Sequence, residues 1–309
     1  MDSSIEINNT TVPAVGFGTY RTGGYECADA VKTALDVGYR HIDTAMAYEN
    51  EAVIGRVIEN ADVDRQDVFL TTKIKGYPEF MEYDGLLEAA EGCLERLGTD
   101  YVDLLLMHWW YEPAGDMEGV FEAMDRLVDE GKVRNIGVSN FSLEELQRAM
   151  RLSDHPIFTN QVEYHPYFDQ NQLLQFCREN DILLTAYSPL AEGRVIEDDV
   201  LARIGKRYGK SAAQVSIRWL IQQENVITIP KSVNEPHIIE NFNVFDFTLS
   251  DTEMQLIAET KGPTLYELTK EGGKLTQLRA TVGPRLPTPV NRTISTVGST
   301  VSKLVKSLS

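Results

Sequence analysis

The sequence predicts a single α/β domain folded as a TIM barrel, the closed (β/α)8 arrangement of parallel strands ringed by helices. Two observations lead to this prediction. Short apolar runs rich in β-branched residues alternate along the chain with segments whose apolar residues recur every three or four positions, as in amphipathic helices. The apolar runs number eight, and eight strands separated by helices favour a parallel sheet that closes on itself.

The predicted strands are almost continuously apolar, which is typical of strands buried on both faces of a parallel sheet. They cover residues 14–20, 41–48, 68–74, 102–109, 133–140, 158–165, 182–190 and 226–232. The segment 11–20 also fits a short N-terminal hairpin. An open, doubly wound sheet is the alternative architecture. However, no GxGxxG motif follows the first strand, and the nearest stretch, GFGTYRTGG, ends in no convincing phosphate-binding turn.

Between the strands lie helical patterns with apolar residues at i, i+3, i+4 and i+7, and a glycine often ends them. The clearest cover residues 27–38, 50–60, 84–98, 119–131, 142–153 and 172–180. Cys27, Cys93 and Cys177 each fall within such a pattern, so we expect them to pack in the core rather than to bind metal or react. Their odd number, and an N-terminal sequence without a signal-peptide pattern, favour a cytoplasmic protein without structural disulfides.

The alternation of strands and helices stops near the C-terminus, so we expect a barrel over residues 1–262 and a C-terminal extension over residues 263–309. Residues 261–309 contain eight basic and two acidic residues, a net charge of +6, which leaves −24 on residues 1–260. Six apolar residues share one helical face: Ile294, Val297, Val301, Leu304, Val305 and Leu308. We expect the extension to be partly disordered, to form an amphipathic helix or to pack across the barrel bottom. Self-association or membrane-surface binding through it stays open.

The chain is strongly acidic. Its net charge of −18, from 47 acidic and 29 basic residues, argues against a nucleic acid partner, which needs clustered Lys and Arg. No stretch approaches the run of about 18 apolar residues that a transmembrane helix needs. This excess of acids predicts an acidic surface, and because such a surface helps a protein to stay soluble in concentrated salt, we hypothesise adaptation to high salt. An ordinary acidic enzyme is the alternative.

Four polar residues fall at or near the carboxyl ends of three consecutive predicted strands, where TIM barrels carry their active sites. They are Asp43, Tyr48, Lys73 and His108. Each could be structural by itself, but neighbouring strands would bring all four together. Tyrosine titrates at about pH 10, so it donates a proton more readily beside a cation such as Lys73, which would need Asp43 to stay charged when buried. With His108 orienting a substrate oxygen, the set suits proton delivery to a carbonyl oxygen.

Seven motifs resemble, in order and spacing, the signatures of the aldo-keto reductases, over residues of roughly 5–260. They are HIDTAMAYENE (41–51), TTK (71–73), LLMHW (105–109), GVSNF (137–141), NQVEYHP (160–166), AYSPL (186–190) and IPKSV (229–233). The resemblance is nearest to microbial reductases of the 2,5-diketo-D-gluconic acid type. It implies an NADPH-dependent carbonyl oxidoreductase in which Tyr48 is the general acid, Lys73 lowers its pKa, Asp43 holds Lys73 and His108 positions the carbonyl. Hydride chemistry of this kind needs no metal, and the sequence offers no HxH or CxxC site for one.

The resemblance also implies a set of cofactor-binding residues. Ser139, Asn140 and Gln161 would hold the nicotinamide carboxamide, and Tyr187 would stack on the ring. The other members would surround the pyrophosphate, the 2′-phosphate and the adenine: Ser188, Leu190, Lys231, Ser232, Val233, His237, Glu240 and Asn241. A lysine beside a serine after the last strand favours NADPH. However, His237 stands where the family often has an arginine, so use of NADH stays open.

Aromatic residues that follow the first, third and fourth strands would line the substrate pocket. Tyr20 and Trp109 are the predicted substrate contacts, whereas Tyr77 and Trp110 could equally pack against the helices. We expect a monomer that acts on a small-molecule carbonyl compound. Two alternatives remain: a non-catalytic cofactor-binding subunit of the same fold, and a phosphate-handling barrel isomerase. The four catalytic residue types disfavour the first, and the absence of a glycine-rich phosphate loop after the last strands disfavours the second.

Overall fold

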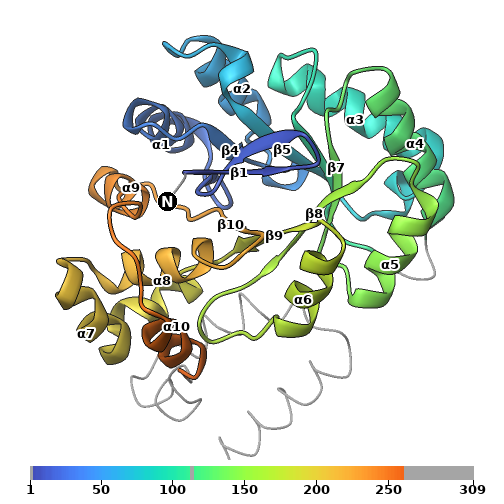
Figure 1. Cartoon of the computed structure of the whole chain (residues 1–309). Coiled ribbons are helices and arrows are strands. Elements are labelled where there is room, and N and C mark those ends of the chain that lie inside the picture. Colours follow the sequence, from blue (N-terminus) through green and yellow to red (C-terminus); the bar gives the residue numbers. More distant parts are fainter. Residues whose placement is uncertain (1–2, 112–114, 261–309) are drawn as a thin grey trace, which may run out of the picture. The chain divides into compact units, whose positions relative to one another are not determined.

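Eight parallel strands form a barrel that is ringed by helices in the computed structural model, which describes residues 3–111 and 115–260 (Figure 1). The strands are β3 (Phe17–Gly18), β4 (His41–Asp43), β5 (Phe69–Ile74), β6 (Leu104–Met107), β7 (Ile136–Ser139), β8 (Ile157–Glu163), β9 (Leu183–Tyr187) and β10 (Val226–Thr228). They follow one another in sequence order around the sheet. Each overlaps one predicted strand, so the predicted TIM barrel is confirmed. The predicted extension, residues 263–309, lies outside the described residues.

The first and last strands close the barrel. Val15 and Thr228 form a parallel bridge, and the Gly16 N–H donates to the Thr228 carbonyl at 2.8 Å. The alternative of an open, doubly wound sheet is therefore wrong. Several predicted strands are too long, among them those at residues 14–20, 133–140 and 226–232. In the strand predicted at residues 41–48, the strand ends at Asp43, and residues Met46–Tyr48 form a single 3-10 turn named η1.

The six predicted helices are present, with bounds that differ by up to three residues. They are α1 (Gly24–Val37), α2 (Glu51–Glu59), α3 (Tyr83–Leu97), α4 (Met117–Asp129), α5 (Leu143–Leu152) and α6 (Asn171–Glu179). Further helices follow that were not among the predicted ones: α7 (Asp199–Tyr208), α8 (Ala212–Ile221), α9 (Glu235–Phe242) and α10 (Asp251–Ala258). Capping boxes that begin at Ser142, Ser211 and Ser250 start α5, α8 and α10. The helices cover the outer face of the sheet, and the main apolar core lies between them and the strands.

An N-terminal hairpin plugs the amino end of the barrel, where it crosses in front of the strands (Figure 1). It consists of β1 (Ser4–Ile7) and β2 (Thr10–Pro13), so the predicted hairpin exists but lies earlier than residues 11–20. Asn8 and Asn9 both have positive φ angles, as a two-residue hairpin turn requires. The hairpin contributes to a second buried core, here called the apolar plug, which comprises Ile7, Val12, Phe69, Leu104, Leu106, Phe158, Leu183 and Ile227.

Polarity increases along the barrel interior from the amino end to the carboxyl end. Residues two apart on a strand face the same side, so Phe69, Thr71 and Lys73 of β5 sample three successive levels. Phe69 lies in the apolar plug, Thr71 Oγ1 lies 3.1 Å from His41 Nε2, and Lys73 binds Asp43 at the top. The middle level is tightly packed: a Cβ atom on the glycine at position 16 would lie 2.5 Å from His41 Nδ1.

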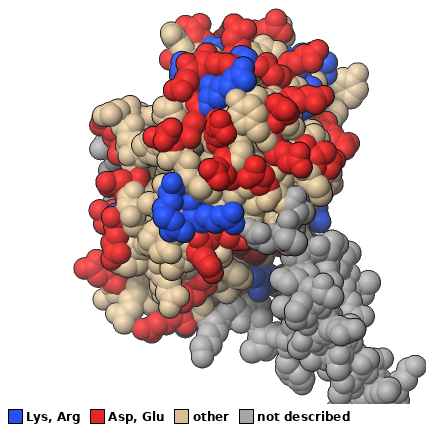
Figure 2. All heavy atoms as spheres, turned by 90° about the vertical axis from the view of Figure 1, so that its right-hand side faces the viewer, with Lys and Arg blue, Asp and Glu red and all other residues tan. Residues whose placement is uncertain are grey.

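Several further sequence predictions concern burial and the surface. Cys27, Cys93 and Cys177 are all buried and free, as expected for core residues. Figure 2 shows one face of the protein, on which acidic side chains clearly outnumber basic ones. Over residues 3–111 and 115–260, no helix has the length and apolar character needed to span a membrane. The same residues contain no cluster of three or more His, Cys, Asp or Glu that could hold a metal ion.

Candidate active site

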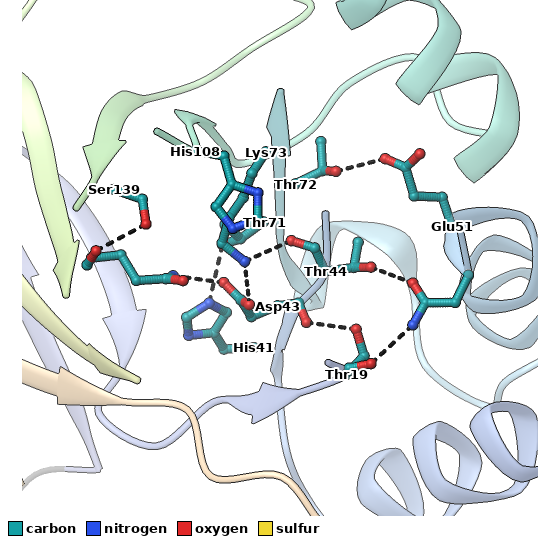
Figure 3. Close-up of polar contacts among 12 residues, drawn as sticks. Thr19, His41, Asp43, Thr44, Glu51, Thr71, Thr72, Lys73, His108 and Ser139 are labelled. Carbon is teal, nitrogen blue, oxygen red and sulfur yellow. Dashed lines mark hydrogen bonds and ion pairs between the residues drawn. The ribbon is translucent and has the colours of Figure 1, made fainter. Parts of the chain in front are cut away.

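A buried ion pair lies at the carboxyl end of the barrel. Lys73 Nζ, from β5, lies 2.5 Å from Asp43 Oδ1 at the end of β4, and it donates a second hydrogen bond to the Thr44 carbonyl at 2.8 Å (Figure 3). Both side chains are almost fully buried. Burial lowers the pKa of Lys73 below its ordinary value, and the adjacent Asp43 carboxylate opposes that shift by favouring the charged ammonium. Asp43 and Lys73 therefore form the predicted pair.

The second oxygen of Asp43 binds a residue from the opposite side of the barrel. Gln161 Nε2, on β8, donates to Asp43 Oδ2 at 2.8 Å, and the Gln161 carbonyl accepts from Ser139 Oγ at 2.9 Å. Gln161 was predicted to hold the cofactor carboxamide. Its contact with Asp43 therefore links the predicted catalytic residues to the residues predicted to bind the nicotinamide carboxamide.

The Tyr48 ring lies next to the ion pair. It ends the 3-10 turn that follows β4, and its ring centroid lies 5.1 Å from Lys73 Nζ, within the range of a cation–π contact. The His108 ring packs against it edge-on at 5.8 Å, and the Tyr20 ring lies at 5.1 Å. The barrel therefore brings Tyr48, Lys73 and His108 together with Asp43, although they come from separate segments of the chain.

Asn140 extends this cluster toward β9. Its Nδ2 donates to the His108 carbonyl at 3.1 Å and to Ser139 Oγ at 2.9 Å, while its Oδ1 accepts from Tyr187 Oη at 2.8 Å. Its φ of 62° is left-handed, a conformation that asparagine tolerates better than most residues. Ser139, Asn140, Gln161 and Tyr187 thus lie in one connected group beside the ion pair.

The predicted phosphate-binding residues follow β10. Lys231 is exposed and lies near β3, since a Cβ atom on the glycine at position 18 would approach the Lys231 Cβ to 3.6 Å. Ser232 Oγ accepts from the Asn234 N–H at 3.0 Å, and Asn234 caps α9 by accepting from the His237 N–H at 3.3 Å. The other predicted residues of this part differ in burial: Val233 and His237 are exposed, Ser188, Leu190 and Glu240 are half-buried, and Asn241 is buried.

A hollow of about 600 Å³ borders the cluster. Trp109, Asn140 and Tyr187 line its inner side, and it extends between the start of α5 and the segment after β8. Tyr20, the other predicted substrate contact, is 40% exposed beside Tyr48. The two aromatic residues whose role the sequence left open differ in burial. Trp110 is buried with its ring 6.4 Å from that of Phe141, whereas Tyr77 is exposed and stacks on Phe80.

Two buried polar residues of the motif HIDTAMAYENE (41–51) were not predicted as site residues. Asn50 is 1% exposed and makes hydrogen bonds to the segments after β3 and β4. Glu51 is equally buried, and it accepts from Thr72 Oγ1 at 2.6 Å (Figure 3). It also accepts from Arg96 Nε at 2.7 Å. Asn50 and Glu51 both lie at the start of a helix, where polar residues are common, so the sequence carried no signal of their burial.

A family model described as "Aldo/keto reductase family" matches residues 14–261. Among curated relatives, 9,11-endoperoxide prostaglandin H2 reductase of Trypanosoma cruzi is 42% identical over 82% of this chain and 89% of the relative. Glyoxal reductase of Bacillus subtilis is 40% identical over 84% and 95%. Morphine 6-dehydrogenase of Pseudomonas putida is 40% identical over 82% and 90%.

Solved structures agree with the family match. A structure assigned as 2,5-diketo-D-gluconic acid reductase B has a TM-score of 0.82 and 43% identity, over 85% of this chain and 93% of that one. The aldo/keto reductase of Brucella melitensis has a TM-score of 0.78 and 39% identity, over 83% and 97%. The resemblance predicted from the seven motifs is therefore confirmed.

Proposed function

Because the chain belongs to the aldo/keto reductase family and is thereby an NAD(P)H-dependent carbonyl oxidoreductase, we propose that it reduces an aldehyde, ketone or keto sugar with NADPH, and that Tyr48 donates the proton. The observation that carries this proposal is the buried Lys73–Asp43 pair beneath the Tyr48 ring. An ammonium held there stabilises negative charge that develops on a phenol oxygen during proton transfer.

Each of the four residues has a distinct part in this proposal. Tyr48 protonates the substrate oxygen, and Lys73 stabilises the phenolate that results. Asp43 keeps Lys73 charged at a buried position where desolvation alone would favour the neutral amine. His108, edge-on to the Tyr48 ring, orients the substrate oxygen by hydrogen bonding. Removing Asp43 would therefore act on the chemistry through Lys73.

The residues beside this cluster fit a nicotinamide cofactor. A carboxamide needs both donors and acceptors, and the hydroxyl of Ser139 and the amides of Asn140 and Gln161 offer both. At the other end, Lys231 and Ser232 supply the cation and hydroxyl that a 2′-phosphate requires. A bound NADPH would supply the hydride for the carbonyl carbon. The exposed cation at position 231 supports NADPH over NADH.

The relatives' names cover chemically diverse substrates, which supports a broad proposal at the level of carbonyl class. The test is a panel of glyoxal, 4-nitrobenzaldehyde and 2,5-diketo-D-gluconate, each with NADPH and with NADH, followed through the nicotinamide absorbance. We expect consumption of NADPH with at least one carbonyl and a higher kcat/KM for NADPH than for NADH. A tenfold preference for NADH would overturn the cofactor assignment. No absorbance change with any carbonyl would overturn the reductase proposal.

The acidic surface supports a second part of the proposal, adaptation to concentrated salt. Acidic side chains dominate the face in Figure 2, and residues 1–260 carry a net charge of −24. Such self-repulsion is relieved by counterions, so the unfolding midpoint should rise between low and molar KCl. An unchanged midpoint would contradict it. The cytoplasmic location and the monomeric state remain predictions.

A further inference from the structure

Asn50 occupies the N-cap position of α2, yet its side chain accepts no hydrogen bond from the helix. Asparagine is favoured at this position because its side-chain oxygen normally pairs with a free N–H of the first helical turn. Here the side chain is buried instead, with 1% of its surface exposed. An explanation for the asparagine at position 50 must therefore lie outside the helix.

The Asn50 amide joins two other segments of the chain. Its Nδ2 donates to the carbonyl oxygens of Thr19 at 3.0 Å and Thr22 at 3.1 Å, and its Oδ1 accepts from Thr44 Oγ1 at 2.6 Å. Both amide hydrogens and the amide oxygen are thus engaged. Since breaking a buried hydrogen bond leaves polar groups unpaired, these bonds hold the segment after β3, the segment after β4 and the start of α2 together.

The partners of Asn50 lead directly to the buried ion pair (Figure 3). The Thr44 carbonyl accepts the 2.8 Å hydrogen bond from Lys73 Nζ. The Asp43 carbonyl accepts from both the N–H and the Oγ1 of Thr19, at 3.1 and 2.9 Å. Asn50 therefore binds one residue whose carbonyl contacts Lys73 and another that fixes the backbone of Asp43.

Tyr48 is connected to the same residue. It lies two positions before Asn50, and its ring packs 5.1 Å from that of Tyr20, the residue after Thr19. We propose that Asn50 is a positioning residue for carbonyl reduction, which fixes Tyr48 relative to the buried ion pair. Its amide is fully engaged with protein groups, so it acts through its neighbours rather than on the substrate. The inference rests on the proposed function, because the effect of Asn50 is exerted through proton transfer from Tyr48.

Proton transfer is sensitive to such positioning. A displacement of about 1 Å costs on the order of 100-fold in rate, and the influence of a cation on a nearby phenol falls as the distance grows. Without the Asn50 hydrogen bonds, the turn that carries Tyr48 and the residues that hold Lys73 can move apart. We therefore expect a lower kcat and an altered pH dependence, with little change in cofactor binding.

The first test replaces the amide by a carboxylate of the same size. Asn50→Asp exchanges two N–H donors for an oxygen that faces two carbonyl oxygens. For 4-nitrobenzaldehyde and NADPH, we expect kcat to fall at least about tenfold and the pH at which kcat declines on the alkaline side to move by about half a unit or more. The Kd for NADPH, measured by tryptophan fluorescence, should change by less than about threefold.

Asn60 provides a matched control for the charge. It lies at the other end of α2, where its exposed side chain donates to the Arg56 carbonyl at 2.7 Å. Asn60→Asp makes the same chemical change at a distance from the site, and we expect wild-type values of kcat, pH profile and Kd.

A second pair of variants decides the question if Asn50→Asp does not fold. Thr44→Val removes the hydroxyl that binds Asn50 but keeps the backbone carbonyl that accepts from Lys73. Thr44→Ser keeps both. We expect kcat to fall about three- to tenfold in Thr44→Val and to recover in Thr44→Ser.

Three results would overturn the inference. The first is a folded Asn50→Asp variant, or a Thr44→Val variant, with the wild-type kcat and pH profile. The second is a loss of kcat with an unchanged pH profile and a parallel weakening of NADPH binding, which would indicate a general structural role. The third is a wild-type protein that reduces no carbonyl compound. That result would reject the proposed function itself, and it can be told apart from the first two results because it is obtained with the unsubstituted protein.

Discussion

The two ends of the barrel interior differ in chemistry although the same strands run through both. At the amino end, side chains of β5, β6, β8, β9 and β10 form an apolar plug with the N-terminal hairpin. At the carboxyl end, the same sheet buries Asp43, Lys73 and Gln161, linked by hydrogen bonds. This contrast indicates that the amino end contributes mainly to stability. At the carboxyl end, burial of polar groups is unfavourable for stability, but these groups are the ones required by the proposed carbonyl reduction.

The two ends therefore respond differently to substitution. Burial of an apolar side chain in the plug contributes about 1.5–3 kcal/mol to the free energy of unfolding, and its removal leaves the polar residues at the other end unchanged. A charged side chain at the other end is stable only while its partner remains, because an unpaired buried charge is strongly unfavourable. Substitutions at the amino end should lower stability and spare activity, and substitutions at the carboxyl end should affect activity first.

Tyr48→Phe should have the largest effect. It removes the proposed proton donor while leaving the ring packing against His108 and Tyr20 intact, so we expect kcat for aldehyde reduction to fall by about 10²- to 10⁴-fold. Tyr101, near the amino end between the guanidinium groups of Arg65 and Arg134, offers the matched control. Tyr101→Phe should keep wild-type kcat, and undiminished reduction by Tyr48→Phe would exclude Tyr48 as the acid.

Asp43→Asn should affect both activity and stability. It leaves Lys73 buried without its counterion, so we expect the free energy of unfolding at neutral pH to fall by about 3–5 kcal/mol in urea titrations. Because an apolar pair is stable without charge balance, the double variant Asp43→Leu with Lys73→Met should regain part of that stability but no activity. If the single and double variants are equally stable, the ion pair is not the cause of the loss.

Leu104→Ala tests the amino end. Leu104 is 1% exposed within the apolar plug, so truncation should create a cavity and lower the free energy of unfolding by about 3 kcal/mol. The site lies at the far end of the strands, and we expect kcat to stay within about twofold of the wild type. A large loss of kcat in protein that is still folded would show that the two ends are coupled.

His41 lies between the two ends and should make stability depend on pH. Burial lowers its pKa from 6.5 to about 4 in the folded protein. The unfolded chain therefore binds a proton as pH falls below 6.5 while the folded protein does not, so stability declines between pH 6.5 and 4 and is unaffected above that window. The loss at pH 5 should reach about 2 kcal/mol. Urea titrations at pH 7 and pH 5 should show a smaller decline for His41→Gln, and a wild-type decline for His237→Gln at an exposed position.

The alternation of strands and helices was readable from the sequence because it depends on neighbouring residues. The apolar residues of α3 recur with the helical period, and β5 falls in a short, nearly continuous apolar run; these local patterns predicted both elements within a few residues. The catalytic candidates Asp43 and Lys73 were predictable for a related reason: a charge in an apolar strand is visible without any knowledge of its partner.

Other contacts between distant residues were decided only by the tertiary structure. Gln161 reaches Asp43 across 118 positions of the chain, a contact that exists because β3 and β10 close the barrel. Trp110 was ambiguous by sequence, and in the structure it is buried with its ring 6.4 Å from that of Phe141, a residue from a separate segment of the chain.

Asn50 best separates what the sequence determines from what folding decides. By local rules it is a helix N-cap, and it does occupy that position. Its side chain nevertheless binds the segments after β3 and β4, because barrel formation places three carboxyl-end segments around one buried amide. The sequence alone thus determined the elements and the charged residues of the site. Their relative positions followed from closure of the sheet, since hydrogen bonds between distant segments form only when the whole barrel is assembled.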